Sequence, residues 1–443
     1  MNTYTETNFK DSEIGKIPKD WEVKELGEIT LKITDGTHST VKDNPNGKNY
    51  LLSCKNIKNG KIILGNKERL IDDETLINLR KRTNLQKNDL LLTTVGTIGE
   101  TSLIKLKKID FELQRSVAII RPNLDLINEI YLYQNSKCYI FQHQAKGSAR
   151  GSVQTCLFLR EINKIKIPLP PTIQEQKAIA KILSDLDSKI EMNKKINENL
   201  EEIGKTLFKR WFVDFEYLNE NGEEYKSNGG EMVFCEELEK EIPKDWRVGR
   251  LGDLVKIQSG FAFKSKDFVK FSNNRIIKIK NISGGIVNLK DSVFIDDTSI
   301  RNIDSKFIIN EKDILIAMTG AEVGKIGVVQ KSENKLLLNQ RVGMFRQISD
   351  FGLLYSYVVF NSNEYLKKIR DKAIGSAQPN ISSTDIENIS LLIPNSEIIS
   401  KFEKIYSNFF NNYIDNLNEI QNLQNTRDVL LPKLMRGEIR VKK

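Results

Sequence analysis

Side chains that can hydrogen-bond to the edges of nucleobases recur in this chain in similar surroundings. Gln114-Arg115 lies in LQRSVAIIRP, and Gln340-Arg341 lies in LNQRVGMFRQ. Glutamine can pair with adenine, and arginine with guanine, in the major groove of DNA. We take the two pairs as equivalent. Because both stretches share them, a role in holding a domain together accounts for these residues equally well.

Two further kinds of stretch offer base-reading side chains, and both differ between matching places of the sequence. DGTHST (35–40) corresponds to SGFAFKS (259–265), and the polar loop GSARGSVQ from Gly147 corresponds to GSAQPNIS from Gly375. Loops that read different nucleic-acid sequences should diverge in this way. For the two polar loops, an ordinary solvated loop is the alternative.

Lys55-Asn56 and Lys280-Asn281 match in both halves, which suits phosphate positioning or a structural turn better than base reading. The candidate nucleic-acid contacts are thus Thr37, His38, Ser39, Lys55, Asn56, Gln114, Arg115, Arg150 and Gln154 in the first half, and Phe261, Lys264, Lys280, Asn281, Gln340, Arg341, Gln378 and Asn380 in the second.

Residue combinations that catalyse reactions or hold metals are missing. The only histidines are His38 and His143, and the four cysteines form no CxxC pair, so neither a zinc site nor a disulfide framework is predicted. GAEVGKIG at 320–327 lacks the spacing and the Ser or Thr of a phosphate-binding loop. The motifs of DNA adenine methyltransferases are absent too. We therefore predict no catalytic residue, no metal and no cofactor in this chain, and binding in place of turnover.

A repeat with an offset of about 225 residues explains why the candidates come in pairs. IPKDW occurs at Ile17 to Trp21 and again at Ile242 to Trp246, and each repeat ends at a proline-marked stop, IPLPP at 167–171 and IPN at 393–395. Between these points lie short β-rich runs separated by Gly, Asn and Asp. The sequence predicts an α+β fold with two strand-rich domains of mixed α/β character.

A heptad pattern predicts a long helix after each stop. Apolar residues alternate at spacings of four and three from Ile179 to Trp211, and again from Phe402 to Leu434. Asn193 and Asn416 occupy the same heptad position, where a polar residue can fix the register of paired helices. The shared frame favours pairing of the two helices with each other, and packing elsewhere is the alternative.

These boundaries divide the chain into five segments. They are a first domain with its N-terminal flank at 1–171, a central spacer helix at 172–217, a linker at 218–240, a second domain at 241–394 and a C-terminal spacer helix at 395–443. The net charge is +9. Because the helical segments are nearly neutral, the basic excess lies in the domains, as expected if they contact phosphates.

The N-terminal stretch MNTYTETNFKDSEIG lacks the basic and then apolar order of a secretory signal, and no apolar run approaches the length of a membrane span. We therefore expect a cytoplasmic protein without a membrane partner.

The order and doubling of these motifs resemble the DNA-specificity subunits of Type I restriction-modification systems. The motifs are IPKDW at the start of each half, Asp-Leu or Asp-Ile before a Gly-containing turn, Gly-Ser-Ala near each domain end, and the closing LLPKLMRGEIRV. The resemblance covers nearly the whole chain. It implies two target-recognition domains that read the unlike halves of a bipartite site in double-stranded DNA.

The resemblance also implies how the parts work together. The two helices pair antiparallel as a coiled-coil spacer, and a helix of about 40 residues is about 60 Å long, against about 34 Å for one turn of DNA. The partners are two methyltransferase (M) subunits and, in the full complex, restriction (R) subunits. S-adenosylmethionine, ATP and Mg belong to these partners, whose complex methylates adenine and cuts DNA.

Apolar residues at the helix ends are our candidates for contacts with the methyltransferase subunits, and core packing against a recognition domain is the alternative. They are Phe208, Trp211, Phe212, Leu434 and Met435. For the whole chain, the alternatives are a related methylation or phage-defence complex without a restriction partner, a coiled-coil scaffold with non-specific DNA binding, and an enzyme with an unrecognised site.

Overall fold

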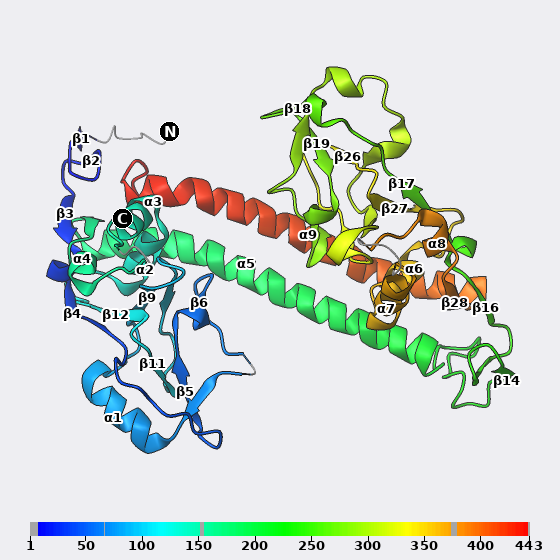
Figure 1. Ribbon diagram of the computed structural model, residues 1–443, viewed down its shortest axis with the longest axis horizontal. Helices are drawn as coiled ribbons and strands as arrows, with labels where there is room; N and C mark the ends of the chain where they lie inside the picture. The colour runs from blue at the N-terminus through cyan, green and yellow to red at the C-terminus, as the bar shows by residue number, and fades with distance from the viewer. Residues whose placement is uncertain (1–7, 66, 151–154, 374–378, 442–443) are drawn as a thin grey trace. The chain divides into compact units, whose positions relative to one another are not determined.

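The computed structural model describes residues 8–65, 67–150, 155–373 and 379–441 and divides the chain into two compact units (Figure 1). The first unit combines 1–190 with 422–443, and the second comprises 191–421. Two long helices, α5 (Ile173–Phe208) and α9 (Ser396–Met435), each contribute one end to each unit. The first unit is therefore built from two separate stretches of chain.

Antiparallel strands form the centre of the first unit. Its four-stranded sheet has the order β10 (Thr101–Leu103), β9 (Leu90–Thr93), β12 (Val117–Pro122) and β4 (Thr30–Asp35). The central strands read LLLT and VAIIRP, and their apolar side chains are buried, as in strands covered on both faces. A second sheet joins β11 (Phe111–Leu113), β5 (Asn49–Leu52) and β8 (Arg69–Ile71), with β11 parallel to β5.

Short strand pairs complete the first unit. They are β1 (Phe9–Lys10) with β2 (Ile17–Pro18), β6 (Ile57–Lys58) with β7 (Lys61–Ile62), and β3 (Glu22–Glu25) with β13 (Lys166–Leu169), all antiparallel. The last pair joins the start of the domain to its end, which explains why IPKDW and the IPLPP stop lie at the same place in the fold.

Four helices connect these strands: α1 (Asp73–Thr83), α2 (Glu129–Lys137), α3 (Tyr139–Gly147) and α4 (Leu159–Asn163). Side chains set their beginnings, because the Asp72 carboxylate accepts from the Thr75 N–H and the Asn128 side chain accepts from two N–H groups of α2. Helix α1 ends at Asn84, which has a left-handed φ of 47°.

The second unit repeats this plan with longer sheets. One has the order β17 (Val255–Ser259), β27 (Val342–Gln347), β24 (Ile314–Ala317), β25 (Ile326–Val328), β21 (Gly285–Val287) and β20 (Ile282–Ser283). The other has the order β18 (Phe268–Val269), β22 (Val293–Ile295), β19 (Asn274–Ile277), β26 (Lys335–Leu338) and β23 (Ile308–Ile309). Its short helices are α6 (Leu353–Phe360), α7 (Asn363–Lys372) and α8 (Ser383–Glu387).

Matching strand pairs confirm the internal repeat. β16 (Arg247–Arg250) pairs antiparallel with β28 (Ser390–Ile393), as β3 pairs with β13. β27 lies between β24 and β17, as β12 lies between β9 and β4. The expected linker, 218–240, contains β14 (Met232–Cys235), which pairs with β15 (Lys240–Pro243). The prediction of two strand-rich α+β domains joined to long helices is confirmed.

Contacts within each unit show that α5 and α9 run antiparallel. In the first unit, Arg427 donates to the Asp187 carboxylate at 3.0 Å. In the second unit, the Asn193 amide donates to Glu419 at 2.7 Å and the Asn416 amide donates to Asn197 at 2.9 Å. Residue numbers thus fall along α9 as they rise along α5.

The two predicted register residues do not meet each other. Asn416 pairs with Asn197, whose own amide donates to the Tyr413 carbonyl at 3.1 Å, whereas Asn193 pairs with a glutamate. Asn193 and Asn197 are both buried. Polar groups in such a seam must keep their partners when the helices pair, so Asn197 belongs with the two residues found from the heptads. Their effect on register stays a prediction.

Replacing the Asn197 and Asn416 side chains should show how much this polar pair contributes to stability. Asn197→Ala leaves the Tyr413 carbonyl and the Asn416 amide without this partner and should cost about 1–2 kcal/mol. The double variant N197L/N416L removes both polar groups and should be at least as stable as the wild type. Thermal unfolding of the three proteins checks this, and an N197A protein as stable as the wild type would contradict it.

Candidate nucleic-acid interface

A cavity of about 970 Å³ opens in the first unit, and the predicted contact residues gather around it. It is lined by the loop after β4, the turn after β5 and the turn between β11 and β12. Five side chains singled out from the sequence lie in its wall: His38, Lys55, Asn56, Gln114 and Arg115. Residues far apart in the sequence thus form one polar surface.

Backbone hydrogen bonds hold the loop after β4 against the turn that carries Gln114. The Thr37 N–H donates to the Leu113 carbonyl at 2.7 Å, and the Arg115 N–H donates to the Thr37 carbonyl at 3.0 Å. A Cβ atom on Gly36 would lie 2.1 Å from the Leu113 oxygen. Only glycine therefore permits this close approach.

A buried carboxylate anchors the same loop. Asp35 accepts hydrogen bonds from His38 Nε2, at 2.7 Å, and from the Arg82 guanidinium at the end of α1. The Asp35 side chain is 12% exposed and that of His38 is 53% exposed. Asp35 thus holds the His38 imidazole at Nε2, and the exposed part of the side chain lines the cavity.

Asn56 and Asn281 are turn residues. Asn56 accepts from the Ser53 N–H and donates to the Ile63 carbonyl, and Asn281 accepts from the Lys278 N–H and donates to the Asn288 carbonyl, all at 2.9–3.0 Å. Both side chains are buried. Of the two roles expected for the repeated Lys-Asn pairs, the structural turn fits the asparagines, while Lys55 and Lys280 are exposed.

The second unit builds its loop in the same way. The Phe261 N–H donates to the Leu338 carbonyl at 2.8 Å, and the Gln340 N–H donates to the Phe261 carbonyl at 2.9 Å. A Cβ atom on Gly260 would lie 2.2 Å from the Asn339 oxygen. The loop approach found at Gly36 therefore recurs in the second unit.

These hydrogen bonds correct the equivalence of the Gln-Arg pairs. Thr37 forms a bridge with Gln114, and Phe261 forms one with Asn339. Arg115 therefore corresponds to Gln340, one position away from the pairing inferred from the sequence. The repeated Gln-Arg dipeptide is out of register by one residue, because Gln114-Arg115 occupies the structural positions of Asn339-Gln340.

An aromatic cluster replaces the polar anchor in the second unit. The Phe261 ring lies 5.1 Å from the Phe263 ring and 5.4 Å from the Phe307 ring, and the Lys306 ammonium lies 5.1 Å from the Phe307 ring. Phe261 is 44% exposed. An exposed ring can contact a thymine methyl group in the major groove, and a lysine beside it can contact a phosphate.

The remaining predicted contacts lie on neighbouring loops or outside the described residues. Arg150 exchanges backbone hydrogen bonds of 3.0 and 2.8 Å with Cys156, which lines the first cavity. In the second unit Asn380 bridges Thr319, and the Arg341 carbonyl accepts from the neighbouring Met318 N–H at 3.1 Å. Ser39 and Lys264 are exposed beside their loops, and Gln154 and Gln378 fall outside the described residues.

Four of the expected contacts with methyltransferase subunits are buried in the two cores, and Phe208 is partly buried against one of them, so their interpretation is corrected. Phe212 lies 4.8 Å from the Tyr355 ring and 4.9 Å from the Phe402 ring, and Trp211 packs beside them. Phe208 packs against the same cluster. Leu434 and Met435 are 1% and 0% exposed in the first core. Because these faces are already covered, core packing, the alternative interpretation, accounts for all five residues.

Sequence reasoning missed the residues that join the C-terminal segment to the start of the first unit. Arg440 donates to both Asp20 carboxylate oxygens, at 2.9 and 2.8 Å, and to Glu175 at 2.9 Å. A Cβ atom on Gly437 would lie 2.4 Å from Pro18 Cγ. The stretch RGEIR after the helix could have suggested a docking segment, but its partner within IPKDW is distant in sequence.

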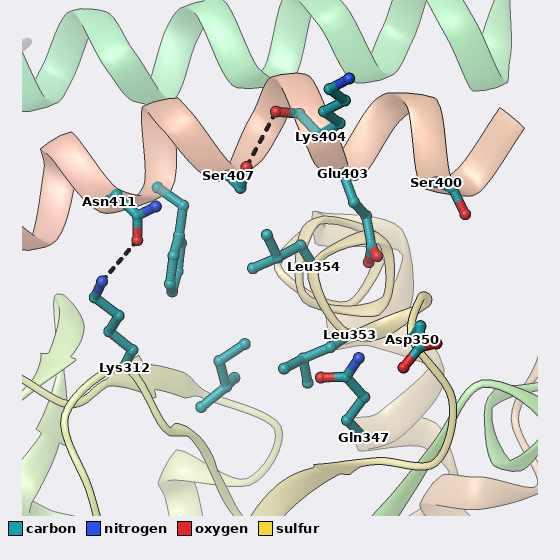
Figure 2. A pocket seen from close by; sticks show the side chains of 12 residues that line it. Lys312, Gln347, Asp350, Leu353, Leu354, Ser400, Glu403, Lys404, Ser407 and Asn411 are labelled. Atoms are coloured by element: carbon teal, nitrogen blue, oxygen red, sulfur yellow. Dashed lines mark hydrogen bonds between the residues drawn. The ribbon is translucent and has the colours of Figure 1, made fainter. Parts of the chain in front are cut away.

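A smaller cavity, of about 470 Å³, lies in the second unit beside α9 (Figure 2). Glu403 points from α9 toward the start of α6, where it accepts from the Gly352 and Tyr355 N–H groups at 3.0 and 2.9 Å. Burial raises the pKa of Glu403. Lys312 donates to Asn411 at 2.8 Å, and both residues line the cavity. These contacts attach the domain to the helix, so the cavity belongs to the scaffold.

The described residues contain no cluster of three or more His, Cys, Asp or Glu side chains that could hold a metal ion. Within the same part of the chain, no helix combines the length and apolar character needed to cross a membrane.

Comparison with known proteins identifies the family. The family model for the Type I restriction modification DNA specificity domain matches residues 18–202 and 243–426. The chain belongs to this family. The two matches correspond to the two repeats, each with most of its long helix.

Individual members of the specificity family match along nearly the whole chain. The chain is 32% identical over 450 residues to the Type I restriction enzyme MjaIX specificity subunit of Methanocaldococcus jannaschii, covering 98% of this chain and 97% of that protein. It is 28% identical to the MjaVIII specificity subunit of the same organism, covering 100% and 98%. The crystal structure of the S subunit from M. genitalium superposes with a TM-score of 0.58 at 18% identity, covering 94% and 96%, which shows a shared fold.

Loss of the Arg440 cluster should weaken the first unit in a pH-dependent way. The hydrogen bond from Arg440 is the largest effect that holds the pKa of Asp20 below its usual value. A lowered carboxyl pKa stabilises the folded state above the unfolded pKa, and this contribution is lost as pH falls through the folded pKa. Because the Asp20 side chain is 50% exposed, solvent screens this pair, and Arg440→Gln should cost about 1 kcal/mol at pH 7.

The cost of R440Q should shrink below about pH 4, where the carboxyl of an unfolded chain becomes protonated. Thermal unfolding of wild type and R440Q between pH 3 and 8 measures the difference. Lys209→Gln, which removes an exposed ion pair with Asp214 in the second unit, is the control. An equal R440Q cost at pH 3 and pH 7 would contradict this account.

Proposed function

We propose that this chain is the non-catalytic DNA sequence-recognition subunit of a Type I restriction-modification complex. The observation that carries the proposal is the pair of loops at Gly36 and Gly260, which share their backbone hydrogen bonds but carry unlike side chains. A repeated scaffold with divergent exposed groups is suited to reading two different sequences. Membership of the specificity family supports the same function.

Each unit reads one half of a bipartite site. Exposed lysines such as Lys55 and Lys280 contact phosphates and set the orientation of the duplex. Side chains of the two loops contact base edges, with polar groups in the first unit and the Phe261 cluster in the second. Because these chemistries differ, the two half-sites differ in sequence.

The partners supply the chemistry that this chain lacks. Two methyltransferase subunits bind S-adenosylmethionine and methylate adenine, and restriction subunits use ATP and Mg. The long helices recruit the methyltransferase subunits and set the gap between the half-sites. Their exposed apolar side chains are the candidate contacts, in place of the buried helix ends. These are Met192, Ile203, Ile405 and Val429, which are 40–59% exposed.

The same surfaces would serve a related methylation or phage-defence complex without restriction subunits. A scaffold that binds DNA without sequence preference is the second alternative, and the anchored loop at Asp35 argues against it, because non-specific phosphate binding needs no fixed polar geometry.

Mapping of adenine methylation tests the proposed function. The chain is co-expressed with its methyltransferase subunit, and modified adenines are located across a genome by single-molecule sequencing. We expect a split motif of two unlike half-sites with an unspecified gap. A continuous motif, or methylation that depends on the methyltransferase subunit alone, would contradict the proposal. Adding a restriction subunit then separates the full complex from the methylation-only alternative.

The two exposed lysines should affect affinity but not specificity. Lys55→Ala or Lys280→Ala removes one phosphate contact, so the slope of log K against log salt concentration should become less steep by about 0.9. The methylation motif should stay the same. Binding of the complex to a cognate duplex at several salt concentrations checks this, and a changed motif would assign these lysines to base reading.

A further inference from the structure

We propose that His38 is a specificity-determining residue of the first unit, and that Asp35 positions it to read a base bearing an amino group. This inference rests on the proposed function and names the chemistry of one position in one half-site. It follows from a hydrogen-bond arrangement that only the first unit contains among the described residues.

The Asp35 carboxylate fixes which ring nitrogen of His38 carries a proton. One carboxylate oxygen of Asp35 accepts from Arg82, and the other lies 2.7 Å from His38 Nε2. An ionised carboxylate only accepts hydrogen bonds. Nε2 must therefore be the protonated nitrogen, which leaves Nδ1 as the acceptor of a neutral imidazole.

The free ring nitrogen is available at the cavity. The His38 side chain is 53% exposed, although Asp35 below it is buried. Within the described residues, the contact with Asp35 is the one hydrogen bond of the ring. The wall of the same cavity also carries Arg115 and Lys55, whose charges suit a DNA backbone. An acceptor held at this place can meet a base edge in the major groove.

An acceptor distinguishes bases along one strand by their exocyclic groups. Adenine presents its N6 amino group and cytosine its N4 amino group, whereas guanine and thymine present carbonyl oxygens. His38 should therefore prefer adenine or cytosine on the contacted strand. A single hydrogen bond of this kind discriminates by about 0.5–1.5 kcal/mol, or roughly 2-fold to 13-fold.

At the equivalent positions, which the structure describes, the second unit has no counterpart to this arrangement. Gly260 and Phe261 occupy the places of Gly36 and Thr37, as their backbone bridges establish. Ser259 and Ala262 then stand where the first unit has Asp35 and His38. The amino-group reader is thus specific to the first unit, and variants should alter only one half-site.

The experiment maps methylation motifs of variants in the complex with the methyltransferase subunit. His38→Ala should relax one position of one half-site and leave the other half-site unchanged. Asp35→Asn gives the sharper result. Its amide oxygen can still accept from Arg82, but its NH₂ donates to Nε2 and moves the ring proton to Nδ1. The preferred base should then change from adenine or cytosine to guanine or thymine.

His143→Ala is the matched control, because His143 is an exposed histidine of the same unit on α3, outside the cavity wall. Its motif should match the wild type. A loss of folding around Asp35 would lower methylation at every site without inverting a base preference, so the motif itself separates positioning from a structural role.

The outcomes separate this inference from the proposed function. A wild-type complex without a bipartite motif overturns the proposed function. A bipartite wild-type motif that H38A leaves unchanged overturns only the role of His38. If H38A does not assemble, H38N is mapped instead. Asparagine offers both a donor and an acceptor, so the amino-group preference should disappear, and its persistence would also overturn the role.

Discussion

Each unit depends on a tryptophan of its IPKDW stretch being covered by the segment that follows the long helix of the other repeat. Trp21 is fully buried, with Arg440 over its ring at 5.9 Å and Gly437 pressed against its neighbour Pro18. Trp246 is covered by the chain that follows α5, including Phe215 at 5.4 Å and the stacked Tyr217 ring. The aromatic surface is too large to leave in water.

This cover also positions the loops at Gly36 and Gly260. β3 and β16 follow the tryptophans directly, and each pairs with the last strand of its own domain. The sheets and the glycine loops are built on that closed frame. Side chains of the loops can then differ between the units without altering the backbone hydrogen bonds that hold the loops. The same fold therefore presents a buried carboxylate in one unit and a phenylalanine cluster in the other.

Patterns with a long period made the architecture predictable from the sequence. The heptads located both helices because many apolar residues repeat the same spacing, and IPKDW located both domain starts. The residues that pair between the two helices were harder to predict from the sequence. Asn193 and Asn416 were found from the frame, but pairing with Glu419 and Asn197 depends on the antiparallel register. The Gln-Arg pairs were misaligned by one residue because a dipeptide carries too little information to fix a turn.

The site was predictable in composition but not in geometry. The sequence indicates His38, Lys55 and Arg115 as candidate contacts, and the fold brings them to one cavity. The roles of Asp35 and Arg82 depend on contacts across 47 residues of sequence, which no local pattern reveals. Trp211 and Phe212 looked like partner contacts because exposed and buried aromatic residues are identical in a sequence.

The division of the first unit has a consequence for how the chain folds. Its last part, 422–443, follows the whole of the second unit, 191–421, in the sequence. A ribosome makes the chain from the N-terminus, so the second unit has all its residues while Trp21 and Asp20 of the first still lack their cover. The domain made first is therefore finished last, and until then its apolar surface is exposed to chaperones or to other nascent chains.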